Sequence, residues 1–307
     1  MKLLPQYEGL TIEQATIKRG LNTEHRYRVS IGDKAVRCGC CRSCKSKKKA
    51  NICDGMPSVT SFSGQYGGGG LYPGGYKAAL DAVFGTYTDK TKTALTDTGW
   101  MRDLAHDARF GKNPLKDEDF LIYRQEVEEI PTPGAIARDF GTGVHQAIDK
   151  LLSAHKADCN CDQTQFHDPE IPAQYAPAVD AVVDWLKRGG ADGPYVVEET
   201  EVNVYHPDLL YGGQIDCVAR CGNSVIIIDW KSGREIYPNH AMQVAAYAFA
   251  YEALTGEKVA EGWIVKTGRH GFEAKQIADL EIATKAFIAM QETKRNVDQI
   301  KWSKEIK

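Results

Sequence analysis

The stretch that decides the fold reads SVIIIDWK and spans residues 224–231. Its first half is an unbroken run of β-branched residues, which is typical of a strand buried on both faces. Asp229 and Lys231 follow directly on this most apolar segment of the chain. Because burying an isolated carboxylate costs several kcal/mol, an aspartate at this position indicates a site for a cation, with an amine held near it.

Further carboxylates fall on the strands expected beside this one. Asp229 and Lys231 are two residues apart, so both point to one face of their strand. We predict strands at 195–205 and 213–220, which carry Glu201 and Asp216, and both side chains can reach the same face. Glu199 shares a strand face with Glu201 and is a rival for its place.

Two predicted helices flank these strands in the sequence. Apolar residues recur at three- and four-residue intervals over 134–156, and this helix carries His145. A helix at 239–254, closed by Gly256, carries Gln243 and Tyr247 four residues apart and hence on one face. A strand at 261–267 and a charged helix at 279–298 complete the expected order.

Three carboxylates beside a lysine suit Mg²⁺ or Mn²⁺, which favour oxygen ligands. Such an ion polarises a phosphodiester and lowers the pKa of a bound water molecule. A lysine can orient that water or offset the charge that develops on the phosphate. Hydrolysis of a nucleic-acid backbone is therefore the chemistry that this set of residues favours.

Five segments, in this order and on these structure types, resemble the RecB-like branch of the PD-(D/E)XK nuclease superfamily, over about residues 134–270. They are GTGVH at 141–145, Glu201, GQID at 213–216, DWK at 229–231 and QVAAY at 243–247. Residues 27–29 and 56–60 are similar, more loosely, to the lead-in of phage-type members. The resemblance implies an α/β fold with a restriction-endonuclease-like core, in which helices flank a central mixed sheet.

The resemblance also implies a role for each matched residue. Asp229 stands where many members have Glu, and both occur in the superfamily. The implied roles are Lys231 as the catalytic lysine; Asp216 and Asp229 as main metal ligands with the backbone carbonyl of Trp230; His145 as a further metal ligand; Glu201 as an outer ligand; and Gln243 and Tyr247 as DNA contacts or braces of the site.

Five of the nine cysteines lie within 16 residues, in a basic segment at 32–54 that has seven Lys or Arg and two Asp. In a reducing compartment such density indicates a metal before a disulfide. Four of the five can build a tetrahedral Zn²⁺ site. An iron–sulfur cluster, which related nucleases carry, is the alternative, although no cysteine follows Cys221, and free thiols are a third. The five residues are Cys38, Cys40, Cys41, Cys44 and Cys53.

Length and charge limit the remaining possibilities. The 307 residues have a net charge of −3, from 38 basic and 41 acidic side chains, which excludes a protein that coats nucleic acid by bulk charge. No apolar run approaches the roughly 18 residues of a membrane span, and the start of the chain lacks a secretory h-region. We therefore expect a cytoplasmic protein that does not bind membranes.

We expect an N-terminal region at 1–133, with the cysteine-rich insertion and a helical segment, and a nuclease core at 134–307.

The function expected from these patterns is a metal-dependent deoxyribonuclease. The resemblance implies an exonuclease that acts on DNA ends in recombination, repair or phage DNA processing, with recombination or other DNA-processing proteins as expected partners. Two alternatives are a nuclease subunit that is active only with a partner and a non-catalytic scaffold that binds DNA ends. The intact set of Asp216, Asp229 and Lys231 argues against the scaffold.

Overall fold

The computed structural model describes residues 1–19, 22–38, 55–60, 133–157, 170–233, 235–268 and 271–297. The chain divides into one unit of residues 1–67 and 143–307 and a second of residues 68–142. Of the second unit only the first part of helix α7 is described, so the fold below is that of the first unit. The helical segment predicted for the N-terminal region and most of the cysteine cluster lie outside the described residues.

A five-stranded mixed sheet forms the centre of the first unit. Its strands lie in the order β5 (Val196–His206), β6 (Tyr211–Cys221), β7 (Ser224–Lys231), β8 (Val259–Gly268) and β9 (Gly271–Gln276). Only β7 and β8 are parallel, and the helix between them supplies the long crossover that a parallel pair requires. The predicted mixed α/β core is therefore confirmed, with β7 buried in its middle. Strand β9 was not predicted, because it is short and only Phe272 and Ala274 of its six residues pack on the core.

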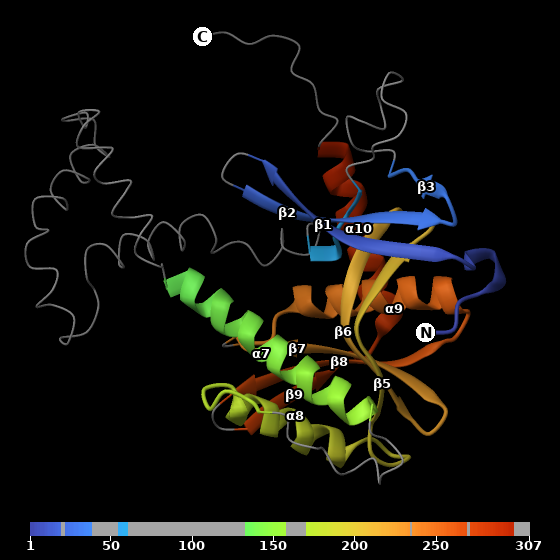
Figure 1. Ribbon diagram of the computed structural model, residues 1–307. Helices are drawn as coiled ribbons and strands as arrows, with labels where there is room; N and C mark the ends of the chain where they lie inside the picture. The colour runs from blue at the N-terminus through green and yellow to red at the C-terminus, as the bar shows by residue number, and fades with distance from the viewer. Residues whose placement is uncertain are drawn as a thin grey trace, which may run out of the picture. The chain divides into compact units, whose positions relative to one another are not determined.

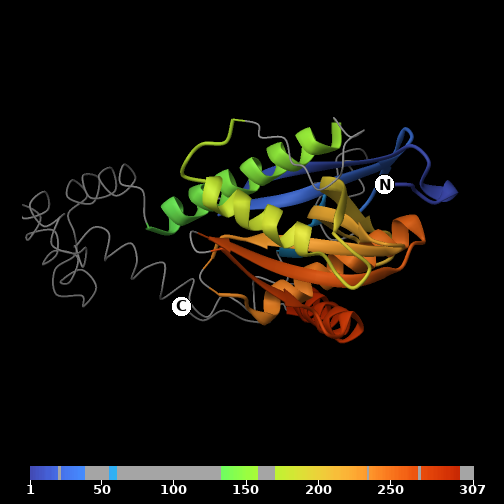
Figure 2. The same ribbon diagram turned by 90° about the horizontal axis from the view of Figure 1, so that it is seen from below.

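Helices cover both faces of this sheet (Figures 1 and 2). On one face α9 (Pro238–Thr255) packs on the strands, and α10 (Leu280–Val297) packs on α9. On the other face lie α8 (Ala176–Arg188) and, from Gly143 onward, α7 (Pro133–Ala157). Helix α9 ends at Gly256 in the left-handed conformation, as predicted. No helix among the described residues is long and apolar enough to cross a membrane.

An N-terminal sheet packs against this core. Strands β1 (Leu10–Arg19) and β2 (Asn22–Ile31) form a long antiparallel hairpin, and β3 (Lys34–Val36) and β4 (Met56–Pro57) both pair with β2. Strand β2 includes residues 27–29 and β4 begins the segment 56–60, the two segments that resemble the lead-in of phage-type members. The hairpin contacts β5 and β6, and its apolar side chains share one core with α9 and α10.

Two adjacent glycines at the start of β6 allow this packing. A Cβ atom on Gly212 would lie 2.5 Å from the Cβ and Cγ atoms of Tyr27 on β2. A Cβ atom on Gly213 would lie 2.4 Å from the Tyr247 ring on α9. Each glycine therefore accommodates a tyrosine ring directly against the β6 backbone, and Gly212 fixes how closely the N-terminal sheet approaches.

Replacing Gly212 with Ala should destabilise the fold. The new methyl group meets the stem of the Tyr27 side chain near the backbone, which cannot move aside cheaply, so we expect a loss of about 1–3 kcal/mol in the free energy of unfolding. Urea denaturation measures this loss. Gly268→Ala is the matched control, because nothing lies within 4 Å of its added Cβ atom. Equal urea midpoints for the two variants contradict this account of the packing.

Candidate active site

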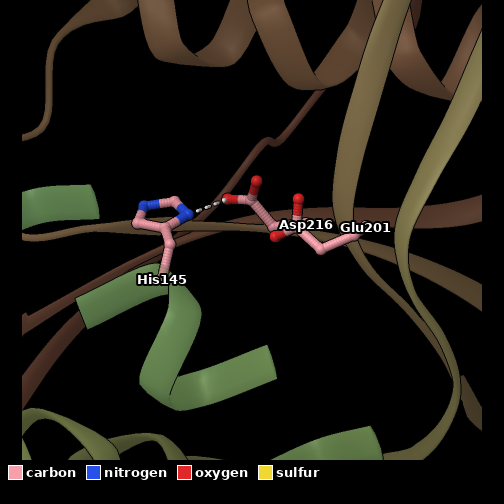
Figure 3. Close-up of side chains that lie close together, drawn as sticks. All are labelled: His145, Glu201 and Asp216. Carbon is pink, nitrogen blue, oxygen red and sulfur yellow. Dashed lines mark ion pairs between the residues drawn. The ribbon is translucent and has the colours of Figure 1, made fainter. Parts of the chain in front are cut away.

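Three metal-ligating side chains from three different elements meet beside the sheet. His145 comes from α7, Glu201 from β5 and Asp216 from β6, and one ligand atom of each lies within 4.8 Å of the other two (Figure 3). The Nδ1 atom of His145 is 3.5 Å from the Oδ2 atom of Asp216. Within the described part of the chain this is the only group of three or more such residues.

The alternation of side chains between the two faces of the sheet breaks at Asp216 in strand β6. Ile215 packs in the core on the α9 side, whereas Cys217, two residues on, packs in the core on the α7 and α8 side. In a regular strand these two side chains would share one face. Asp216 lies at this irregularity beside His145 on α7, and its Oδ2 atom accepts a hydrogen bond of 2.8 Å from the backbone N–H of Trp230.

The backbone of Glu201 is strained at the same level of the sheet. The β5–β6 ladder pairs Thr200 with Cys217 and Val202 with Ile215, so that Glu201 lies opposite Asp216. Its φ angle is +50°, in the left-handed region that residues other than glycine adopt only at a cost. Strain of this kind persists where the surrounding structure enforces it, and it is concentrated at functional sites.

Asp229 ends the apolar strand β7 with only 1% of its surface exposed. Its Oδ2 atom forms an ion pair with the ammonium group of Lys231, so the two residues share a face as their spacing predicts. Its Oδ1 atom is buried and accepts no hydrogen bond. A buried carboxylate oxygen without a donor is energetically costly, and a bound cation removes that cost.

The charges of the cluster shift one another's pKa values. Burial and the nearby Asp216 raise the pKa of Glu201 to about 7. Burial also raises the pKa of Asp229, although Lys231 opposes the shift. Asp216 behaves in the opposite way, because His145 and Lys231 outweigh its burial and hold its pKa below the usual value.

The carboxylates raise the pKa values of Lys231 and His145 in turn. Burial lowers the pKa of Lys231, but Asp229 and Asp216 raise it more, so the amine stays charged. The pKa of His145 is likewise raised by Asp216 against the effect of burial. Three carboxylates thus share one lysine and one histidine. Their oxygen-rich donor set, with the orphaned Asp229 oxygen, fits Mg²⁺ or Mn²⁺.

Helix α9 contributes a hydrogen-bonded pair to this region. The Nε2 atom of Gln243 donates to the Tyr247 hydroxyl at 2.8 Å. Burial raises the pKa of Tyr247 well above its usual value, and the neighbouring Asp229 and Asp216 raise it further. The pair therefore lies beside the carboxylates, and its contact with DNA stays a prediction.

Other expected residues lie elsewhere or outside the described residues. Glu199, the rival of Glu201, forms an ion pair with the amino group of Met1 and does not join the cluster. Trp230 contacts Asp216 through its N–H, and a role for its carbonyl stays a prediction. Cys38 is buried in the core. The remaining cysteines of the cluster, Cys40, Cys41, Cys44 and Cys53, lie outside the described residues, so the zinc or iron–sulfur site also stays a prediction.

Two residues near the cluster were not predicted. The pKa of Tyr27 on β2 is raised to about 12 by burial and by the charges of Glu201 and Asp216. Burial and the charge of Lys231 lower the pKa of His240 to about 4. His240 precedes Gln243 by three residues on α9, and this spacing was a usable signal for it.

The affinity of this cluster for Mn²⁺ should rise with pH. Metal binding requires Glu201 to lose its proton, and with its pKa near 7 it is mostly protonated at pH 6 and mostly ionised at pH 8. We expect about tenfold tighter binding at pH 8 than at pH 6, measured by isothermal titration calorimetry. His145 must also lose its proton and shifts the affinity in the same direction.

A control substitution distinguishes the roles of the two glutamates of β5, Glu201 and Glu199. Glu201→Gln should weaken Mn²⁺ binding and flatten its pH dependence, whereas Glu199→Gln should leave both unchanged. Equal affinity of the unaltered protein at the two pH values contradicts the assignment of Glu201 to the metal cluster.

Comparisons with known proteins identify the family. The model of the PD-(D/E)XK nuclease superfamily matches residues 120–303. No curated protein matches the chain. The solved structure of SSO0001 is 21% identical with a TM-score of 0.24, and the match covers 33% of this chain and 50% of that one. An alkaline exonuclease from Laribacter hongkongensis is 17% identical with a TM-score of 0.25, and that match covers 42% of this chain and 73% of the exonuclease.

The chain thus spans half the length of the first of these structures. The family model, in contrast, covers more than half of the chain and includes His145, Glu201, Asp216, Asp229 and Lys231. The protein therefore belongs to the PD-(D/E)XK nuclease superfamily.

Proposed function

We propose that this protein is a metal-dependent deoxyribonuclease whose active site is the cluster around Asp229. The observation that carries the proposal is the buried Asp229 carboxylate, which has one oxygen paired with Lys231 and the other without a hydrogen bond. Asp216 lies next to Asp229. One ligand atom each of His145 and Glu201 lies within 4.8 Å of a carboxylate oxygen of Asp216. Membership of a nuclease superfamily gives this arrangement its chemical context.

The divalent cation would be Mg²⁺ or Mn²⁺. Bound at this cluster, such an ion lowers the pKa of a coordinated water and offsets charge on the phosphodiester. The residues that would hold it are Asp216, Asp229, Glu201 and His145, with the backbone carbonyl of Trp230.

Lys231 is proposed as the catalytic lysine. Its side chain is 20% exposed, so it is largely buried and partly open to solvent. The ion pair with Asp229 fixes its position, and the two aspartates keep it charged. A fixed ammonium can orient an attacking water or stabilise the charge that develops on the phosphate. Gln243 and Tyr247 are proposed to brace the carboxylates or to contact DNA.

We further propose that the substrate is a DNA end and that the context is recombination, repair or phage DNA processing. The resemblance of the sequence to exonucleases of the RecB-like branch supports this choice. DNA-processing proteins are proposed partners. For the cysteine cluster we propose a Zn²⁺ site, with an iron–sulfur cluster as the alternative, and metal analysis of the purified protein distinguishes the two.

Lys231→Ala should reduce cleavage of linear DNA by about 100-fold or more, because the loss of a fixed donor at the reacting phosphate has an effect of this size. End-labelled linear and closed circular DNA, single- and double-stranded, are incubated with Mg²⁺, Mn²⁺ or EDTA. DNA binding, measured with Ca²⁺ in place of Mg²⁺, should persist. Because the substitution leaves Asp229 buried without its partner, thermal unfolding is measured in parallel.

Lys258→Ala is the control for this experiment. Its side chain is 87% exposed and pairs with Glu252 at the surface, so its removal should leave cleavage unchanged. Cleavage by Lys231→Ala at the rate of the unaltered protein would contradict the proposed active site. Metal-dependent loss of linear DNA alone supports an exonuclease, whereas cutting of circles changes the proposal to an endonuclease. Absence of activity on every substrate favours the partner-dependent subunit or the scaffold.

A further inference from the structure

A row of charged side chains runs from Lys231 across the last two strands of the central sheet. Lys231 pairs with Lys266 in the parallel ladder of β7 and β8, and Lys266 pairs with Glu273 in the antiparallel ladder of β8 and β9. Paired residues on adjacent strands point to the same face of a sheet, and the strands lie about 4.8 Å apart. The row therefore begins at the proposed active site and ends on β9, the last strand of the sheet order.

This row lies on the face of the sheet against which α9 packs. Ile264, two residues before Lys266, packs in the core that includes α9. Phe272 on β9 packs instead in the core on the α8 side. Because side chains alternate along a strand, Glu273 points to the α9 face, and Lys275, two residues further on, shares that face.

The side chains of the row become more exposed with distance from the active site. The exposed fractions are 20% for Lys231, 24% for Lys266, 45% for Glu273 and 55% for Lys275. The row thus leads from a largely buried lysine to the surface. A polymer with one phosphate at Lys231 can lie along it.

Glu273 holds both outer lysines of the row. Its Oε2 atom forms an ion pair with the ammonium group of Lys266, and its Oε1 atom lies 3.3 Å from the Nζ atom of Lys275. Exposed ion pairs of this kind contribute little to stability. The three side chains carry a net positive charge, and the carboxylate between the two amines occupies a position that phosphate oxygens, which are also anionic acceptors, can take.

We propose that Lys266 and Lys275 bind the DNA backbone beside the phosphate at Lys231, and that Glu273 holds the two amines in place and is exchanged there for a backbone phosphate. This inference rests on the proposed function and assigns the β8–β9 hairpin to the path of the DNA strand. Phosphate contacts position DNA without reading its bases, so the row adds affinity without sequence preference.

The test measures binding of a labelled DNA duplex by fluorescence anisotropy at a series of KCl concentrations, with Ca²⁺ in place of Mg²⁺. Lys266→Gln and Lys275→Gln should each bind about five- to tenfold more weakly near 0.1 M salt, and each should reduce the slope of log K against log salt by about 0.9. Mn²⁺ binding and thermal unfolding should be nearly unchanged. If Lys266→Gln fails to fold, Lys275→Gln, at a more exposed position, provides the same test.

Glu273→Gln should act in the opposite direction. It removes the anion that competes with phosphate for the two amines, so we expect about two- to fivefold tighter DNA binding. An ion pair that only stabilised the hairpin would give no such gain. The controls carry the same charge changes elsewhere: Lys258→Gln precedes β8 at its other end, and Glu281→Gln lies on α10 in an exposed pair with Lys285. Both should bind DNA as the unaltered protein does.

The outcomes separate this inference from the proposed function. If Lys231→Ala loses cleavage while Lys266→Gln and Lys275→Gln bind DNA with unchanged affinity and salt slope, the role of the row is wrong and the active site stands. Weaker binding by Glu273→Gln, or an equal loss in Lys258→Gln, also overturns the role of the row. If the unaltered protein neither binds nor cleaves DNA, the proposed function and this inference fail together.

Discussion

The burial of the Asp229 carboxylate at the end of an apolar strand is the constraint on which the rest of the site depends. Lys231 pairs with one of its oxygens, and no hydrogen-bond donor reaches the other. Asp216 adds negative charge beside it and raises its pKa further, and Glu201 lies within reach of Asp216 and His145. A cluster of this composition is incomplete without a cation, which links the packing of the sheet directly to metal-dependent chemistry.

The sheet and the tyrosines around it bring these groups together. Strand β6 changes its facing at Asp216, and the opposite residue Glu201 has a strained backbone. Just before this irregularity, Gly212 and Gly213 admit the rings of Tyr27 and Tyr247 against the strand. One ring comes from the N-terminal sheet and the other from α9. Two parts of the chain that lie far apart in sequence thus pack against adjacent residues of β6.

The sequence was informative wherever the structure is regular. The apolar run of β7 and the period of two placed Asp229 and Lys231 on one face, and helical spacing paired Gln243 with Tyr247. The same reasoning could not decide between Glu199 and Glu201, because alternation assumes a regular strand and β5 is irregular at that level. The packing of Tyr27 against Gly212 could not be predicted for another reason. Its place depends on the long-range packing of the N-terminal hairpin, which no local pattern encodes.

The most direct test of the central claim is to locate Mn²⁺ bound to the protein by anomalous diffraction from crystals grown with that ion. The account predicts an anomalous peak that contacts the carboxylates of both Asp216 and Asp229, with His145 or Glu201 as a further ligand. A peak elsewhere, or an ordered cluster that stays metal-free at saturating Mn²⁺ with Lys231 still the sole partner of Asp229, would contradict it.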